Sequence, residues 1–397
     1  MFLQQLGRGL RLHRDKNVCT VLDFIGQQHR RFRFDLRLRA MTGRSRGELL
    51  RVTKAEIPLL ASGCMVQLDR QAERDILDNL QAATNAPLKR MANELAELKA
   101  QRGRLSLTNY LVATLHEPDD IYRGTNTWTN MRRLASVACA PAGPREAELL
   151  AGVRLRLQDV DDPERICMLR ALGRGDPIPS APRSQRLATM LSYVLFADGP
   201  APESLAAVRM ALHDEPAVRR ELVELADVLE ESAATLTLPD QQWGDVPLHI
   251  HATYTKGDVL AALGTRQLGD KTALREGVKH VKACNADLLF VTLHKSERPT
   301  TRYRDYAISR DLFHWESQSG TTRRSATGQR DLGDASRIML FVRQQQKDAS
   351  GRTMGFMYLG AATRLSDRGE RPIAIDWRLT TPMPEAMLRI ARAVAIS

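Results

Sequence analysis

The chain has 397 residues, enough for two or three domains that each bury a core. Apolar residues make up 43% of the chain and charged residues 26%, which are typical of globular proteins and argue against a disordered chain. Apolar runs are far shorter than the ~20 residues of a membrane-spanning helix, and no cationic-then-apolar leader opens the chain. We therefore expect a cytoplasmic protein that has no membrane partner.

The five cysteines stand apart from one another, with no C-x-x-C pair and no histidine at metal-ligand spacing. The pattern predicts neither a disulfide framework nor a zinc site, and we expect this chain to bind no metal.

The net charge of +11 is distributed unevenly: +9 over residues 1–54, −5 over 55–239 and +7 over 240–397. Two basic ends predict two surfaces for polyanions, and the expected partner is nucleic acid, specifically DNA. For the C-terminal excess, ordinary surface charge in an arginine-rich chain is an equally good explanation.

The first eleven residues contain the pattern Q-x-x-G-R-x-x-R, made by Gln4, Gly7, Arg8 and Arg11. Arginines three residues apart lie on one side of a helical turn, so both can point at the same phosphate. A guanidinium group stabilises the charge that develops on a departing γ-phosphoryl group. A strand-like run, V-C-T-V-L-D-F, follows at residues 18–24. The alternative is a basic amphipathic turn with no nucleotide nearby.

Residues 1 to about 45 resemble the closing segment of the second motor domain of superfamily-2 (DEAD/DEAH-type) helicases. The resemblance implies that Arg11 is an arginine finger and Arg8 its companion in ATP hydrolysis. It also implies that Gln4 and Gly7 are nucleotide-binding positions.

The sequence contains no P-loop of the form G-x-x-x-x-G-K-[ST] and no D-E-x-[DH] run to hold magnesium. We therefore expect ATP and magnesium to be cofactors of a complete motor only, and this chain alone not to hydrolyse ATP. The expected protein is the C-terminal part of a longer helicase. An upstream helicase portion, if it is encoded separately, is an expected partner.

Arginine and phenylalanine alternate directly after the predicted strand. Aromatic rings between cations can stack on bases while the cations neutralise phosphate. We expect Phe32 and Phe34 to pack on the core, and Arg30, Arg31 and Arg33 to contact nucleic acid.

Residues 51–239 show helical spacing of apolar residues and no catalytic constellation, so we expect a helical connector. One helix is expected after Pro87, with Met91 and Leu95 on its apolar face, and another from Pro216. The three prolines and two glycines of residues 173–183 predict a loop. We expect Trp128 to be a core anchor.

Beyond residue 240 the pattern changes to short strands separated by turns, with a helix after Pro384. Mostly antiparallel strands in a small barrel or sandwich are predicted. The fold class is thus α/β and α+β: a remnant of a RecA-like motor domain (1–50), a helical connector (51–239) and a β-rich domain (240–397). The expected strands are 248–254, 287–293, 306–309, 337–342, 356–359 and 373–379.

The last region contains five distinctive phrases: F-V-T-L-H-K (290–295), Y-R-D-Y-A-I-S (303–309), F-H-W-E-S-Q (313–318), L-F-V-R (340–343) and Y-L-G (358–360). With these phrases, residues 240–397 resemble an uncharacterised domain that closes certain bacterial superfamily-2 helicases, proteins that often carry a phospholipase-D-like nuclease domain. The resemblance leaves the molecular role of the domain open.

Between residues 298 and 330, arginines surround His314, Trp315 and Gln318. This combination suits the reading of a base edge together with phosphate contacts, or a pocket for an extruded or modified base. Equally, Phe313 and Trp315 can pack in the core while the polar side chains satisfy the backbone. The candidate nucleic-acid-binding residues are Arg302, Arg304, His314, Trp315, Gln318, Arg323 and Arg324.

Two further functions are weighed as alternatives. One is a stand-alone DNA- or protein-binding module that reads a target or a modified base. The other is a metal-dependent nuclease, because Asp305, Glu316 and Gln318 form a loose D…E-x-Q set, although such spacing arises easily by chance. The pair His294-Lys295 lacks the H-x-K spacing of a phospholipase-D site.

Overall fold

The computed structural model describes residues 88–103, 105–114, 116–197, 202–232, 237–266, 268, 274, 276–294, 304–333, 337–348 and 351–396. The predicted motor-domain tail lies outside them. So do the candidate residues Gln4, Gly7, Arg8, Arg11, Arg30, Arg31, Arg33 and Arg302.

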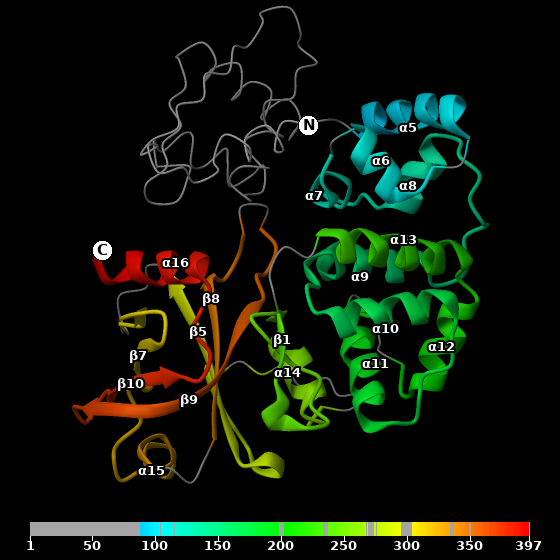
Figure 1. The fold of residues 1–397 in the computed structure, drawn as a ribbon. Coiled ribbons are helices and arrows are strands. Elements are labelled where there is room, and N and C mark those ends of the chain that lie inside the picture. The colour runs from blue at the N-terminus through cyan, green and yellow to red at the C-terminus, as the bar shows by residue number, and fades with distance from the viewer. Residues whose placement is uncertain are drawn as a thin grey trace, which may run out of the picture. The chain divides into compact units, whose positions relative to one another are not determined.

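The chain divides into two compact units (Figure 1). The first comprises residues 1–123 and 130–137, and the second comprises residues 124–129 and 138–397. We describe each unit separately. No helix in the described parts of either unit is long and apolar enough to cross a membrane.

The described part of the first unit is helical. Its α5 has the predicted apolar face, with Met91 and Leu95 fully buried. Tyr110 of α6 donates a hydrogen bond of 3.2 Å from its hydroxyl to the Met91 carbonyl oxygen, which joins the two helices. The helices are α5 (Leu88–Arg102), α6 (Leu107–Thr114), α7 (Pro118–Ile121) and α8 (Trp128–Leu134), which begins in the second unit.

Three helices of the second unit, α10, α11 and α13, start at proline, where the missing N–H costs no hydrogen bond. The predicted loop lies between α10 and α11, and Gly175 ends α10 with a φ of 80°. Trp128 is fully buried, as predicted, and its indole donates a 2.7 Å hydrogen bond to Glu224. The helices are α9 (Glu146–Arg156), α10 (Pro163–Arg174), α11 (Pro182–Leu195), α12 (Leu205–His213) and α13 (Pro216–Ser232), with a 3-10 turn, η1, at Leu157–Asp159.

The rest of the second unit is built around one mixed sheet of eight strands, so the α+β class is confirmed. Its order is β4-β5-β8-β9-β10-β7-β6, with β3 paired to β9 and a separate β1-β2 pair. All neighbours are antiparallel except β5 and β8, which are parallel. The strands are β1 (Leu238–Pro239), β2 (His249–Ile250), β3 (Thr253–Tyr254), β4 (Val278–Val281), β5 (Ala286–His294), β6 (Tyr306–Ala307), β7 (Leu312–Glu316), β8 (Arg337–Gln345), β9 (Phe356–Arg368) and β10 (Ala374–Leu379).

The sheet is open rather than a closed barrel, because β4 and β6 stand at its two ends and do not pair with each other. It nevertheless wraps around a single core. Val291 of β5 and Trp315 of β7 belong to the same buried cluster, although three strands separate β5 from β7 in the sheet order. In Figure 1, β5 and β8 run across the direction of β10.

The unit also contains α14 (Lys256–Ala262), α15 (Ala326–Leu332), α16 (Glu385–Ile396) and the 3-10 turns η2 (Gln241–Trp243) and η3 (Lys282–Cys284).

Candidate functional site

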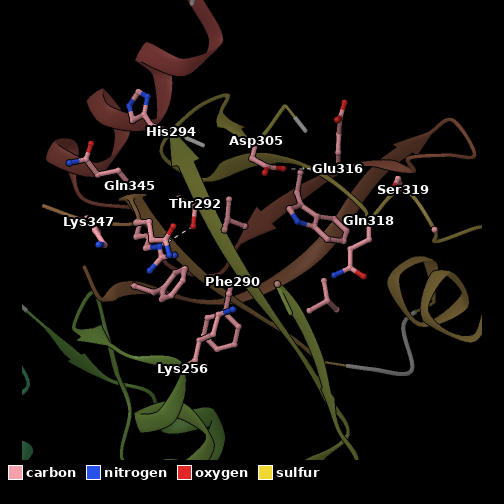
Figure 2. Close-up of a pocket in the computed structure, with 18 residues that line it drawn as sticks. Lys256, Phe290, Thr292, His294, Asp305, Glu316, Gln318, Ser319, Gln345 and Lys347 are labelled. Carbon is pink, nitrogen blue, oxygen red and sulfur yellow. Dashed lines mark hydrogen bonds between the residues drawn. The ribbon is translucent and has the colours of Figure 1, made fainter. Parts of the chain in front are cut away.

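A pocket of ≈ 970 Å³ lies where β5, β7 and β8 approach α14 (Figure 2). Its volume is at the upper end of the ~300–1,000 Å³ that small-ligand sites occupy. Aromatic rings, amides, cations and carboxylates all contribute to its lining. The curvature of the sheet makes the pocket, because it brings together strands that are not neighbours in the sheet.

Arg343 of β8 provides one charge of the pocket. Its Nε donates a 2.9 Å hydrogen bond to the hydroxyl of Thr292, its register partner on β5, and its Nη1 donates to the Met354 carbonyl oxygen at 3.1 Å. The guanidinium carbon lies 4.2 Å from the centre of the Phe356 ring. Burial lowers the pKa of Arg343, because the charged form loses hydration. All these partners are neutral, so the charge is solvated by dipoles and a ring rather than by a carboxylate.

Lys256 provides a second charge against the same aromatic group. Its Nζ lies 5.4 Å from the Phe290 ring centre and 6.0 Å from that of Phe356. The residue sits in the first turn of α14, whose start is fixed by hydrogen bonds between Thr255 and Asp258. Burial lowers the pKa of Lys256, and the nearby charge of Arg343 lowers it further, against a smaller opposite effect of the Glu276 carboxylate.

Carboxylates and amides line the other end of the pocket. The Glu316 amide donates a 3.1 Å hydrogen bond to Asp305, and the Arg304 amide donates a 3.0 Å hydrogen bond to Glu316 Oε2. Gln318 follows on the loop after β7 and is exposed. All three residues of the loose D…E-x-Q set line this pocket, although the Glu316 and Gln318 side chains point in opposite directions in Figure 2. Across the described ranges, however, no cluster of three or more His, Cys, Asp or Glu side chains could hold a metal ion.

The structure separates the predicted pair His314 and Trp315, because alternate residues of a strand point to opposite faces. Trp315 lines the pocket and belongs to the hydrophobic core, with 5% of its surface exposed. His314 points away and shares a 2.6 Å hydrogen bond between its Nδ1 and the Asp376 carboxylate. Burial raises the pKa of Asp376, but hydrogen bonds from His314 and Ser366 outweigh this effect, and its pKa is lowered.

The described arginines of the predicted set do not line the pocket. Arg323 donates to Asp367 and to the Gly369 carbonyl oxygen, and thereby holds the turn after β9. Arg304 and Arg324 are exposed.

Sequence reasoning missed Lys256 and Arg343, although Arg343 closes the L-F-V-R phrase and Thr292 lies within F-V-T-L-H-K. The sequence did contain one signal for Arg343: it is a cation that directly follows the apolar run of residues 338–342. No comparable signal marks Lys256, which reaches the pocket from a separate helix.

A family model described as a domain of unknown function, DUF3427, matches residues 248–390. Domains of this kind are found in helicase-associated proteins. The matched segment, called the DUF3427 region below, contains every residue that lines the pocket.

No curated protein matches the chain. Among solved structures, Arabidopsis thaliana SUVH6 in complex with SAM is similar over 57% of this chain and 41% of that one, with 11% identity and a TM-score of 0.24. The chain thus spans less than half the length of that protein, and a likeness this weak carries no argument.

Proposed function

We propose that this chain is the C-terminal part of a superfamily-2 DNA helicase and that its DUF3427 region contacts DNA. The observation that carries the DNA contact is the pair of partly buried cations, Lys256 and Arg343, in the pocket. Each charge is disfavoured by burial, and the two repel each other, so a bound anion would stabilise both. A DNA phosphate is such an anion, and the net charge of +7 over residues 240–397 favours its approach.

The helicase part of the proposal rests on the Q-x-x-G-R-x-x-R pattern and on the occurrence of DUF3427 domains in helicase-associated proteins. In a complete cytoplasmic motor, Arg8 and Arg11 would stabilise the γ-phosphate of ATP, with Gln4 and Gly7 beside the nucleotide. ATP and magnesium would be bound mainly by an upstream portion that carries a P-loop. The chain alone would bind DNA without hydrolysing ATP.

A salt titration of DNA binding tests the contact. The affinity of the full chain for a short duplex is expected to fall as salt rises, with a log–log slope of about −0.9 for each phosphate contact. Lys256→Gln with Arg343→Gln should weaken binding and make the slope shallower by about 2, because two cations are lost. Arg209→Gln is the matched control, since Arg209 is exposed on α12 and outside the pocket.

The result that contradicts the contact is an affinity independent of salt, or a double variant that binds as tightly as the unaltered chain. Arg343→Lys separates charge from hydrogen-bond geometry and should retain most of the affinity. A second measurement addresses the motor: ATP turnover by the chain, with or without DNA, should be absent. Robust turnover would overturn the assignment of the P-loop to an upstream portion.

A further inference from the structure

Lys256 and Arg343 place two positive charges against one aromatic ring. The Nζ of Lys256 lies 6.0 Å, and the guanidinium carbon of Arg343 4.2 Å, from the centre of the Phe356 ring. Both side chains line the pocket, and both residues are partly buried. An anion must therefore enter the pocket to reach them. We call these two residues the cationic corner of the pocket.

Arg343 is held in a fixed orientation and still has a donor to offer. Its Nε and Nη1 donate to the Thr292 hydroxyl and the Met354 carbonyl oxygen, whereas its Nη2 donates to no described residue. The two hydrogen bonds fix the plane of the guanidinium group. A group fixed in this way loses little conformational freedom when Nη2 donates to an oxygen of a bound anion.

The charge of the cationic corner matches a dianion. Burial and the Arg343 charge lower the pKa of Lys256 by more than the exposed Glu276 carboxylate raises it, and burial alone lowers the pKa of Arg343. An internal phosphate of a DNA strand carries a single negative charge. A phosphate at the end of a strand carries about two near neutral pH. A terminal phosphate therefore balances both cations, whereas an internal one balances only half of their charge.

The rest of the lining also favours the end of a strand. In Figure 2, Asp305 lies at the opposite end of the pocket from Lys256. A second phosphate of the same strand would be repelled there. An internal phosphate has a nucleotide on each side, so its strand would have to cross the pocket and leave beyond Asp305. A strand end needs only one entrance, and the volume of ≈ 970 Å³ accommodates a terminal phosphate with its nucleotide.

We propose that the cationic corner binds the terminal phosphate of a DNA strand, with phosphate oxygens at Lys256 Nζ and Arg343 Nη2. This assignment rests on the proposed DNA contact and specifies which phosphate makes it. Thr292 is a positioning residue, because its hydroxyl orients the guanidinium group. The chemistry is common to 5′- and 3′-phosphates. The pocket thereby distinguishes a strand that ends from one that continues.

Binding of the full chain to duplexes of one sequence that differ only at their ends tests the assignment. The ends carry 5′-phosphates, 3′-phosphates or hydroxyl groups alone. We expect at least one of the phosphorylated duplexes to bind about tenfold more tightly than the hydroxyl-ended duplex, because it adds charge-assisted hydrogen bonds.

Variants locate this preference in the pocket. Lys256→Gln with Arg343→Gln should bind the three duplexes equally, so its loss of affinity is largest for the preferred phosphorylated duplex. Thr292→Val retains both charges and should reduce the preference only in part. Arg209→Gln, at an exposed site on α12 outside the pocket, should retain the whole preference. Thermal melts verify that each variant is folded.

Free dTMP, which carries the same terminal phosphate, distinguishes a strand end from a free nucleotide. Tight dTMP binding without any advantage for a phosphorylated duplex would overturn the assignment to DNA ends. Equal binding of the three duplexes by the unaltered chain, weakened equally for all three in the double variant, would also overturn it but would leave the proposed DNA contact standing. Absence of binding to every duplex would refute the proposed contact itself.

Discussion

The hydroxyl of Tyr254 donates a 2.5 Å hydrogen bond to the carboxylate of Asp162, a residue 92 positions earlier in the chain. The same carboxylate begins α10, because it accepts from the amides of Glu164 and Arg165. The buried Arg165 guanidinium lies 3.5 Å from Asp258 and 5.2 Å from the centre of the Tyr254 ring. One fully buried carboxylate thus begins a helix and also anchors β3, which ties the α10 helix to the DUF3427 region.

Tyr254→Phe tests this connection. The Tyr254 hydroxyl also accepts from the His249 amide at 2.8 Å, so its removal leaves both a buried carboxylate oxygen and a buried N–H without their partner. We expect the free energy of unfolding to fall by about 2–4 kcal/mol in denaturant titrations. Tyr306→Phe is the control, with an expected change within about 0.5 kcal/mol. Equal effects of the two substitutions would show that the hydroxyl of Tyr254 contributes nothing specific.

Gly152→Ala tests the packing of α9 on α11. A Cβ at Gly152 would collide with the carbonyl oxygen of Leu195, so the helices would have to separate. Overpacking of this kind costs about 1–3 kcal/mol, more than the helix propensity gained from alanine. A lower denaturation midpoint is expected, whereas Gly320→Ala, where a Cβ meets nothing within 4 Å, should have little effect. An unchanged midpoint for Gly152→Ala would mean that the close approach is easily relieved.

Asp331 makes stability depend on pH. Burial first, and the Asp287 carboxylate second, raise its pKa from 3.8 to about 7. Both of its carboxyl oxygens are buried and accept no hydrogen bond from the described residues. The folded state therefore binds a proton that the unfolded state releases, and stability falls as pH rises from about 4 to about 7, by an amount on the order of 2–4 kcal/mol. Thermal melts across this range should show a flatter profile for Asp331→Asn; an identical profile would contradict the raised pKa.

Lys256→Gln tests whether the charge of Lys256 contributes to DNA binding or to the stability of the fold. Burial and Arg343 disfavour the charge, whereas Lys256 Nζ donates a 2.6 Å hydrogen bond to the Glu276 carbonyl oxygen. Because these effects oppose each other, the substitution should change the free energy of unfolding by no more than about 1 kcal/mol. DNA affinity should fall in the same variant. Thermal melts and binding isotherms of one preparation measure the stability and the DNA affinity of the variant. A marked loss of stability without loss of affinity would identify Lys256 as a structural residue.

Apolar runs and prolines in the sequence identified those strands and helices whose residue pattern is continuous along the chain. The apolar run at residues 287–293 gave β5 to within one residue at each end, and Pro216 gave the start of α13. The strand expected at 248–254 is instead two short strands, β2 and β3, because His251 adopts a positive φ of 73° between them. The strand β7 was not among those predicted, although Phe313 and Trp315 alternate there as a strand requires.

By itself, the sequence determined the class of the fold, the helices that start at proline and the apolar strands, because periodicity and backbone preferences are properties of neighbouring residues. The tertiary structure alone decided that β5 pairs in parallel with β8, that the sheet stays open, and that Lys256, Arg343 and Glu316 line one pocket. Those relationships depend on hydrogen bonds and packing between segments far apart in the chain. No local pattern specifies which strand will be the neighbour of another.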